Sequence, residues 1–217
     1  MKTVVVCSGG LDSVTLAYLV RHEHILDRLV TFDYGQRHKV EIEYAARAAA
    51  DLGVRHDIVD ISMLRPFLAG SALTDNVPVP DGHYAEDSMR ATIVPNRNPI
   101  MLTIAYGIAA ADDADFVAAA VHGGDHFIYP DCRPEFIKAF AAMQDLALDG
   151  VWRVGLLTPF VDKSKAEIVT IGAGLNVPFE RTWSCYRGGE VHCGTCTERR
   201  EAFALAGVAD PTDYADR

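Results

Sequence analysis

The string SGGLDS, residues 8–13, has the residue types of a phosphate site, because it joins a β-branched run to a stretch with helical periodicity. Its two glycines let a ligand approach the backbone, and the first N–H groups of a helix attract an anion. The hydroxyls of Ser8 and Ser13 add hydrogen-bond donors. The same string also suits a plain strand-to-helix turn that Asp12 or Ser13 caps. A carboxylate beside phosphate requires a cation, so Asp12 fits either a helix cap or a ligand of Mg²⁺.

A second polar group follows the next β-branched run. Asp33 ends this run about two dozen residues after the glycine turn, where nucleotide-binding folds place an acidic partner of a ribose. Phe32 precedes Asp33, and the letters DYGQ equally suit a turn after a strand. Arg37 and His38 come next at the start of a predicted helix, and the sequence leaves their roles open.

Polar residues gather in HGGDHFIYPDCRPEF, residues 122–136, directly after the fourth predicted strand. That position is the carboxyl edge of the sheet, where open α/β folds bind ligands. Asp125 or Asp131 could accept hydrogen bonds from the N–H groups of a ligand. Arg97 or Arg133 could pair with a ligand carboxylate through two parallel hydrogen bonds. Single polar residues in loops are usually solvated or caps, so the cluster carries this prediction.

The letters DKSKAE, residues 162–167, place two cations at the start of a predicted helix. Cations are disfavoured at a helix N-terminus, which favours a functional reading over a solvated first turn. Either Lys163 or Lys165 could bring positive charge to a reacting phosphate, and we prefer Lys163.

Three of the five cysteines lie close together near the C-terminus, at Cys185, Cys193 and Cys196. This spacing predicts thiolate ligands of a structural zinc, which usually has four ligands. His192 is the nearest candidate for the fourth, although neighbouring ligands are geometrically awkward. Glu198, a distant histidine, a water, or no metal at all are the alternatives.

Short β-branched runs alternate with amphipathic or Ala-rich stretches, which predicts βαβ units around a parallel sheet in one domain, residues 1–217. The expected strands are 3–7, 28–33, 56–60, 115–121 and 153–158. The expected helices are 12–23, 38–52, 98–112, 133–147, 163–174 and 197–206. The Pro-rich stretch 62–97 predicts a long excursion from the sheet, of the kind that forms lids or binding loops. Asn98 and Pro99 suit the cap and first position of the third helix.

The composition limits the class of partner. The chain has 217 residues and a formal net charge of −10, which argues against a general grip on nucleic acid. No apolar run approaches the roughly 18 residues of a membrane-spanning helix, and the N-terminus does not read as a signal peptide. We therefore expect a cytoplasmic protein with no membrane partner.

The glycine string resembles the pyrophosphate loop of the N-type ATP pyrophosphatases, and within them the chain is similar to the 7-cyano-7-deazaguanine synthase (QueC) family. The matching segments keep their order over nearly the full length: FDYGQRHKVEIEYA (32–45), GSALTD (70–75), VPNRN (94–98), YPDCRPEFIKAF (129–140), LLTPFVDKSKAEIV (156–169) and TWSCYRGGEVHCGTC (182–196).

This resemblance implies a Rossmann-like, adenine nucleotide alpha hydrolase-like α/β fold with helices on both faces and a zinc-binding segment at 182–206. It also implies a homodimer that uses ATP and Mg²⁺, with bound Zn²⁺, to convert 7-carboxy-7-deazaguanine and ammonia to the nitrile. The nucleotide-binding residues would be Ser8, Gly9, Gly10, Leu11, Asp12, Ser13, Phe32 and Asp33, with Asp12, Ser13 and Lys163 in catalysis.

The chain departs from the family at its cysteines, because the family usually has four in this segment and HCGTCTERR lacks one. This departure leaves two other classes open. One is a related ligase that couples the activated deazaguanine carboxylate to another amine, for example on a protein. The other is a non-catalytic, zinc-bearing nucleotide sensor.

Overall fold

Five parallel strands form one sheet in the order β3-β2-β1-β4-β5. The computed structural model describes residues 1–37, 39–75, 87–186 and 193–212. The strands are β1 (Lys2–Val6), β2 (Ile25–Asp33), β3 (Arg55–Asp60), β4 (Phe116–Ala118) and β5 (Gly155–Leu157). The predicted parallel α/β sheet is confirmed.

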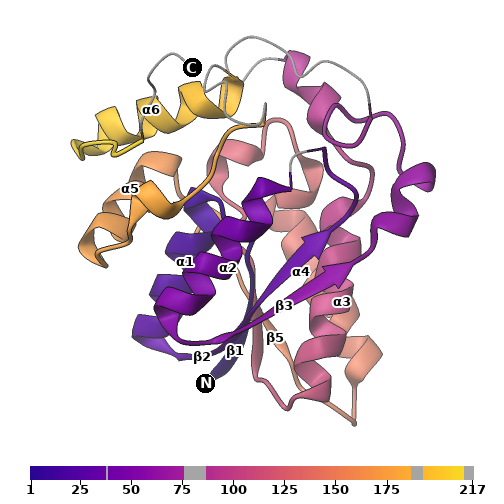
Figure 1. The fold of residues 1–217 in the computed structure, drawn as a ribbon. Helices are drawn as coiled ribbons and strands as arrows, with labels where there is room; N and C mark the ends of the chain where they lie inside the picture. Colours follow the sequence, from indigo (N-terminus) through magenta and orange to yellow (C-terminus); the bar gives the residue numbers. More distant parts are fainter. Residues whose placement is uncertain (38, 76–86, 187–192, 213–217) are drawn as a thin grey trace.

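Within the described residues, six α-helices cover the two faces of the sheet (Figure 1). They are α1 (Leu11–Glu23), α2 (Val40–Leu52), α3 (Arg97–Ala111), α4 (Pro134–Leu148), α5 (Lys165–Gly174) and α6 (Gly194–Ala206). Helices α1, α2, α5 and α6 share one apolar cluster with the sheet, and α3 and α4 share another. Short 3₁₀ helices occupy Ser62–Phe67, Asp87–Thr92, Gly123–Asp125, Pro130–Cys132 and Phe179–Arg181.

The central strand β1 explains why both faces need helices. Val4 packs in the cluster that contains α3 and α4, whereas Val5 packs in the cluster of the other four helices, and both are fully buried. A strand buried on both faces reads as a continuous apolar run, as residues 4–6 do. Each such side chain stabilises the fold by about 1.5–3 kcal/mol through burial.

The strand order creates a crevice at one edge of the sheet. The chain moves from β1 to β2 and β3 in one direction and from β4 to β5 in the other. Where the order reverses, the loops after β1 and β4 separate and leave space for a ligand. These loops contain residues 7–10 and 119–122, so the fold brings the glycine string and the polar cluster together.

Three local predictions need correction. Strands β4 and β5 are shorter than 115–121 and 153–158. Ala119 donates one more hydrogen bond to the Leu157 carbonyl at 3.0 Å, and residues 119–121 line a pocket beyond the end of β4. Helix α3 begins at Arg97 after Asn96, whose φ is 56°, and the Asn98 side chain instead donates to Cys132 Sγ at 3.5 Å. Asn98 is therefore not the cap, and Pro99 is the third residue of the helix.

The excursion 62–97 holds two 3₁₀ helices, and residues 76–86 lie outside the described part.

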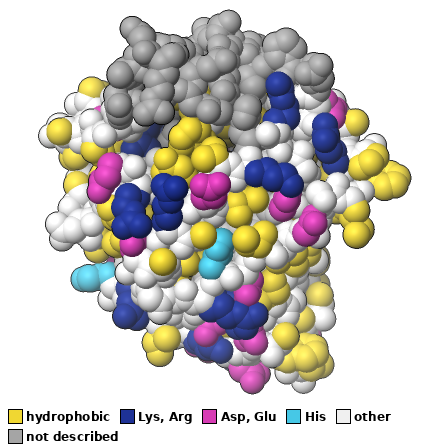
Figure 2. All heavy atoms as spheres, viewed as in Figure 1, with side chains coloured by type: hydrophobic (Ala, Val, Ile, Leu, Met, Phe, Trp, Pro, Cys, Tyr) yellow, Lys and Arg dark blue, Asp and Glu magenta, His cyan; other side chains and the backbone are white. Residues whose placement is uncertain are grey.

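The outer surface mixes charges of both signs. On the face seen in Figure 2, Lys and Arg side chains are interspersed with Asp and Glu. On α2, for example, Arg47 pairs with Glu43 at 3.6 Å. Among the described helices, none combines the length and the apolar character needed to cross a membrane.

Candidate active site

A pocket of about 260 Å³ lies at the crevice between β1 and β4. Its walls come from the ends of β1, β2 and β4, the first turns of α1, α2 and α3, and the segment that leads into α6. Among the site residues predicted from the sequence, the pocket is lined by Ser8, Asp12, Ser13, Phe32, Arg97 and Asp125.

The glycine loop is shaped by close contacts with other elements. Gly9 has a φ of 82°, and a Cβ there would lie 2.3 Å from the Glu41 carbonyl oxygen of α2. The Gly9 carbonyl accepts a hydrogen bond from the Trp183 N–H at 2.9 Å. A side chain at position 9 would therefore separate the loop from both of these neighbours.

Ser13 organises the loop from inside helix α1. Its hydroxyl oxygen accepts from the Ser8 N–H at 3.2 Å, and the hydroxyl lies 3.1 Å from the Gly10 carbonyl that it donates to. The residue before α1 is Gly10, and no side chain caps this helix. The reading of Asp12 or Ser13 as a helix cap is therefore wrong.

Asp12 stands at the centre of a charged cluster. Its Oδ2 lies 3.4 Å from Lys165 Nζ and 3.7 Å from His122 Nε2, while Lys165 Nζ lies 2.6 Å from Glu198 Oε2. The other oxygen, Oδ1, is buried without a hydrogen-bond partner among the described residues. Buried polar atoms normally have a partner, so this oxygen points to a ligand that completes the site.

His122 holds two carboxylates in place. Its Nδ1 accepts a hydrogen bond from the Gly124 N–H at 3.1 Å, which assigns the proton of the neutral ring to Nε2. That nitrogen faces Asp12 and, at 3.4 Å, Asp125. A Cβ at Gly124 would lie only 3.1 Å from the imidazole, so the glycine allows this packing.

Lys165 carries its positive charge despite being largely buried. Burial alone would lower the pKa of its ammonium group, but the carboxylates of Asp12, Glu198 and Asp125 outweigh burial and raise it. The opposite balance holds for Glu198, where burial raises the carboxyl pKa above its ordinary value although Lys165 lowers it. The result is a fixed cation beside the glycine loop.

The far end of the pocket is built from tyrosines, an arginine and a second glutamate. The Arg97 guanidinium carbon lies 5.5 Å from the centre of the Tyr34 ring, and Tyr129 and Tyr186 also line this end. Glu41 joins them from the first turn of α2. Burial raises the pKa of the Glu41 carboxyl to about 7, against the lowering effects of Arg97 and Gln36.

The whole chain matches one family of known proteins. The family model described as "Queuosine biosynthesis protein QueC" matches residues 2–207. The chain is 67% identical over 219 residues to the 7-cyano-7-deazaguanine synthase of Ruegeria pomeroyi, covering 100% of this chain and 95% of that protein. The protein of the same name from Rhizobium etli is 65% identical over 220 residues, covering 100% and 93%. The chain belongs to the QueC family.

A solved structure of NMN synthetase from Francisella tularensis resembles this QueC-family chain with a TM-score of 0.50 and 16% identity, covering 95% of this chain and 77% of that one. At that identity the likeness concerns the fold alone. It agrees with the predicted parallel α/β architecture.

Several residues predicted from the sequence do not line the pocket of this QueC-family chain. Asp33 pairs with Lys39 at 2.5 Å, and the Arg133 guanidinium donates to the His126 carbonyl at 2.8 Å. The Lys163 carbonyl accepts from the Gly123 N–H at 2.8 Å. Four more predicted site residues do not line the pocket: Gly9, Gly10, Leu11 and Asp131. Leu11 is buried in the core.

Two residues that line the pocket are not among the preferred site residues of the sequence analysis. Glu41 is not singled out there, and Lys163 is preferred to Lys165. A signal for Lys165 was present, because Ser164 and Glu167 form a capping box that starts α5 at Lys165. That motif places Lys165, and not Lys163, on the first helical turn. Glu41 had no comparable signal, because its position depends on how α2 packs against the glycine loop.

The three cysteines predicted to bind metal do come together. The Sγ atoms of Cys185, Cys193 and Cys196 all lie within 4.8 Å of one another. The pKa of Cys193 is lowered, first because Cys185 and Cys196 donate hydrogen bonds to its sulfur and then because Thr195 does. His192, the predicted fourth ligand, lies outside the described residues.

Proposed function

We propose that this chain is the ATP-dependent 7-cyano-7-deazaguanine synthase that its family indicates. One observation carries the proposal: a single pocket joins the glycine loop and the fixed cation Lys165 to Arg97 and a set of aromatic rings. The first end suits the phosphates of ATP, and the second suits a flat base that carries a carboxylate.

The reaction needs two activations of one carbon. A carboxylate oxygen of 7-carboxy-7-deazaguanine attacks the α-phosphorus of ATP, and pyrophosphate leaves. Ammonia then attacks the carbonyl carbon, AMP leaves, and a proton is lost to give the amide. The amide oxygen then attacks the α-phosphorus of a second ATP, and a second pyrophosphate leaves. Loss of AMP and of the two N–H protons gives the nitrile.

The residues at the phosphate end fit a Mg²⁺ ion. The unpartnered Asp12 Oδ1 is the observation that supports this fit, with Asp125 close by across His122. Asp12 and Asp125 would hold the ion, and Mg²⁺ bound there would spread the negative charge of the β- and γ-phosphates. Ser8 and Ser13 would donate to the same phosphates.

Lys165 is the better candidate for the cation at the α-phosphate. It lines the pocket and is held between Asp12 and Glu198, whereas Lys163 does not line the pocket. A preorganised charge stabilises the transition state most where negative charge develops. We therefore give Lys165 the role first assigned to Lys163.

The cysteine cluster fits Zn²⁺, because the three sulfur atoms all lie within 4.8 Å of one another. Cys185, Cys193 and Cys196 would hold the ion, with His192 as the fourth ligand. When bound, the metal would cross-link the segment before α6 to the start of that helix. A single domain, a homodimer and a cytoplasmic location complete the proposal.

Asp12→Asn tests the proposal, because it removes the charge at a nearly isosteric side chain. We expect the wild type to release pyrophosphate only when 7-carboxy-7-deazaguanine is present, and the variant to lose this release at least 100-fold with its thermal unfolding little changed. Release independent of the base contradicts the proposed substrate. ATP binding without any release would indicate the nucleotide sensor.

A further inference from the structure

Glu41 is fixed at the pocket by a buried glutamine. The Gln36 side chain donates through Nε2 to Glu41 Oε1 at 3.0 Å and to the Phe32 carbonyl at 3.3 Å. Its own Oε1 accepts from the Tyr34 N–H at 2.9 Å, and only 5% of Gln36 is exposed. Gln36 therefore anchors Glu41 to the end of β2, and the mechanism above gives this carboxyl no task.

The backbone of Glu41 is anchored as firmly as its side chain. Its carbonyl oxygen lies so close to Gly9 that a residue with a Cβ at position 9 would clash with it. Helix α2 thus holds Glu41 at a set position relative to the phosphate loop. A residue anchored twice and facing a ligand pocket is suited to read a ligand's shape.

Charges divide the pocket into two ends, and Glu41 belongs to the end without the phosphate-binding groups. The carboxylates that act on Lys165 are Asp12, Glu198 and Asp125. Glu41 instead shares its electrostatic neighbourhood with Tyr34 and Arg97. The phosphates lie at the first end, so the second end is left for a flat base, which is either the deazaguanine or the adenine of ATP.

We propose that Glu41 is the specificity residue that binds the N1–H and the exocyclic 2-amino group of the deazaguanine, and this inference rests on the proposed function. A carboxylate presents two acceptors side by side, which match the two adjacent donors of a guanine edge. This assignment replaces Asp125, which faces His122, and Asp131, which does not line the pocket.

The same chemistry excludes adenine as the partner of this carboxylate. The edge of adenine offers one acceptor and one donor, so the ionised carboxylate would face the N1 lone pair with no proton between them, and only a protonated Glu41 could pair with adenine. A glutamine at position 41 has the opposite preference, because its amide supplies one donor and one acceptor. Glu41→Gln therefore separates the two bases that this pocket could hold.

The test combines this substitution with a substrate that lacks the 2-amino group, 7-carboxy-7-deazahypoxanthine. With 7-carboxy-7-deazaguanine, we expect Glu41→Gln to lower kcat/KM by roughly 10- to 100-fold and leave the KM for ATP unchanged, because charged hydrogen bonds are lost. Removing the 2-amino group should cost the wild type a similar factor and the variant less, since the glutamine offers one acceptor in place of two.

Glu43→Gln is the matched control, because Glu43 lies on the same helix turn with 68% of its side chain exposed. It should leave both substrates unaffected, and thermal unfolding of each variant checks the fold. Two results overturn the inference, provided that the wild type still forms nitrile. One is that the kcat/KM losses from the substitution and from the missing 2-amino group simply multiply. The other is that Glu41→Gln raises the KM for ATP. A wild type that neither binds nor converts the deazaguanine overturns the proposed function together with it.

Discussion

At the scale of single residues, the pair of lysines in DKSKAE makes the sharpest comparison. Lys165 lies 3.4 Å from Asp12, which is in the first turn of α1 directly after the glycine loop. Lys163 shares its sequence surroundings but does not line the pocket. We predict that Lys165→Ala lowers kcat for pyrophosphate release by about 100-fold. Lys163→Ala should change kcat less than about threefold, because this side chain does not line the pocket.

Steady-state kinetics with both variants measure this difference. Thermal unfolding is needed alongside, since Lys165→Ala leaves Asp12 and Glu198 without their shared cation. A folded Lys165→Ala enzyme with normal kcat, or a crippled Lys163→Ala enzyme, would return the role to Lys163.

Glu41 makes stability depend on pH. Its folded-state pKa of about 7 lies above the ordinary 4.5, so the folded protein holds the proton more tightly than the unfolded chain. The stability that this proton contributes is complete below about pH 4.5 and is lost as the pH rises through about 7. We predict that Glu41→Gln gains stability relative to the wild type over that range, as denaturant unfolding at pH 5 and pH 8 will show. A constant difference between the two proteins would mean that Glu41 titrates normally.

At the scale of elements, helix α6 connects the cysteine cluster to the pocket. Its first turn contains Cys196 and Thr195, which lines the pocket, and the same helix supplies Glu198 to Lys165. Arg199 holds the preceding segment by donating to the Phe179 carbonyl at 2.9 Å and to the Thr182 hydroxyl at 2.8 Å. Metal bound at the start of α6 would therefore support the catalytic lysine as well as the fold.

We predict about one zinc ion per chain in the purified protein, which metal analysis measures directly. Cys196→Ser should lose the zinc, unfold at lower temperature and release pyrophosphate more slowly, because α6 positions Glu198. His192→Ala should lose zinc only if its imidazole is the fourth ligand. A metal-free wild type with full activity would refute the zinc site.

The sequence predicted which segments form helices and strands better than it predicted the residue at which each one begins. Periodicity and β-branched runs placed the five strands and six helices of the described residues, because each contributes apolar side chains to the two clusters beside the sheet. The start of α3 was misplaced, since the side chain of Asn98 contacts Cys132 from a distant loop. Similarly, Asp33 has the expected place after β2, but Lys39 pairs with its carboxylate. Contacts between remote segments decide such cases, and one sequence does not contain them.

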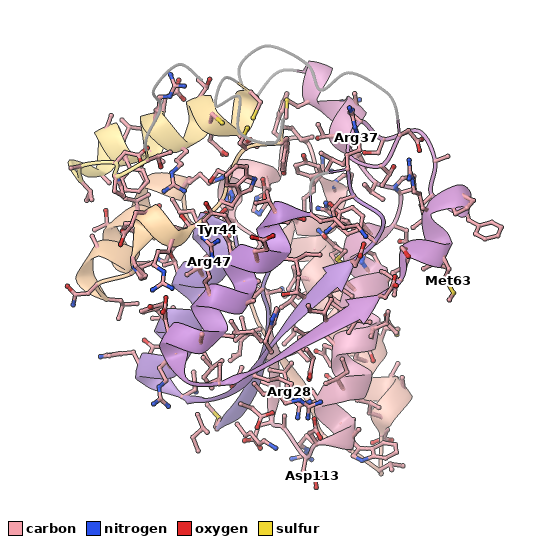
Figure 3. All side chains as sticks on the ribbon, viewed as in Figure 1. Arg28, Arg37, Tyr44, Arg47, Met63 and Asp113 are labelled. Atoms are coloured by element: carbon pink, nitrogen blue, oxygen red, sulfur yellow. The ribbon has the colours of Figure 1, made fainter. Side chains whose placement is uncertain are left out.

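At the scale of the whole molecule, the two edges of the sheet have separate tasks. The carboxyl edge holds the pocket, and Arg28 lies far from Arg37 at the other end of the molecule (Figure 3). The Arg28 guanidinium pairs with Asp27 at 2.9 Å, with Asp57 at 2.8 Å and with Asp112, and 8% of the Arg28 side chain is exposed. This cluster joins β2 and β3 to the end of α3 and touches no part of the site.

We predict that Arg28→Met lowers the free energy of unfolding by about 2–3 kcal/mol, because three carboxylates lose their shared cation. Activity at low temperature should stay unchanged. Arg55→Met is the control, since Arg55 also pairs with Asp57 but has 64% of its side chain exposed. That variant should lose less than about 1 kcal/mol. Equal losses in chemical denaturation would contradict the importance of burial.

The central claim is tested most directly by mass spectrometry of a reaction that contains the purified protein, ATP, Mg²⁺, ammonium and 7-carboxy-7-deazaguanine. The account predicts 7-cyano-7-deazaguanine, with two AMP and two pyrophosphate formed for each nitrile because two oxygens must be activated in turn. With ¹⁵N-ammonium, the nitrile should carry the label. A base that stops at the amide, gains a different amine, or remains unchanged would contradict the account.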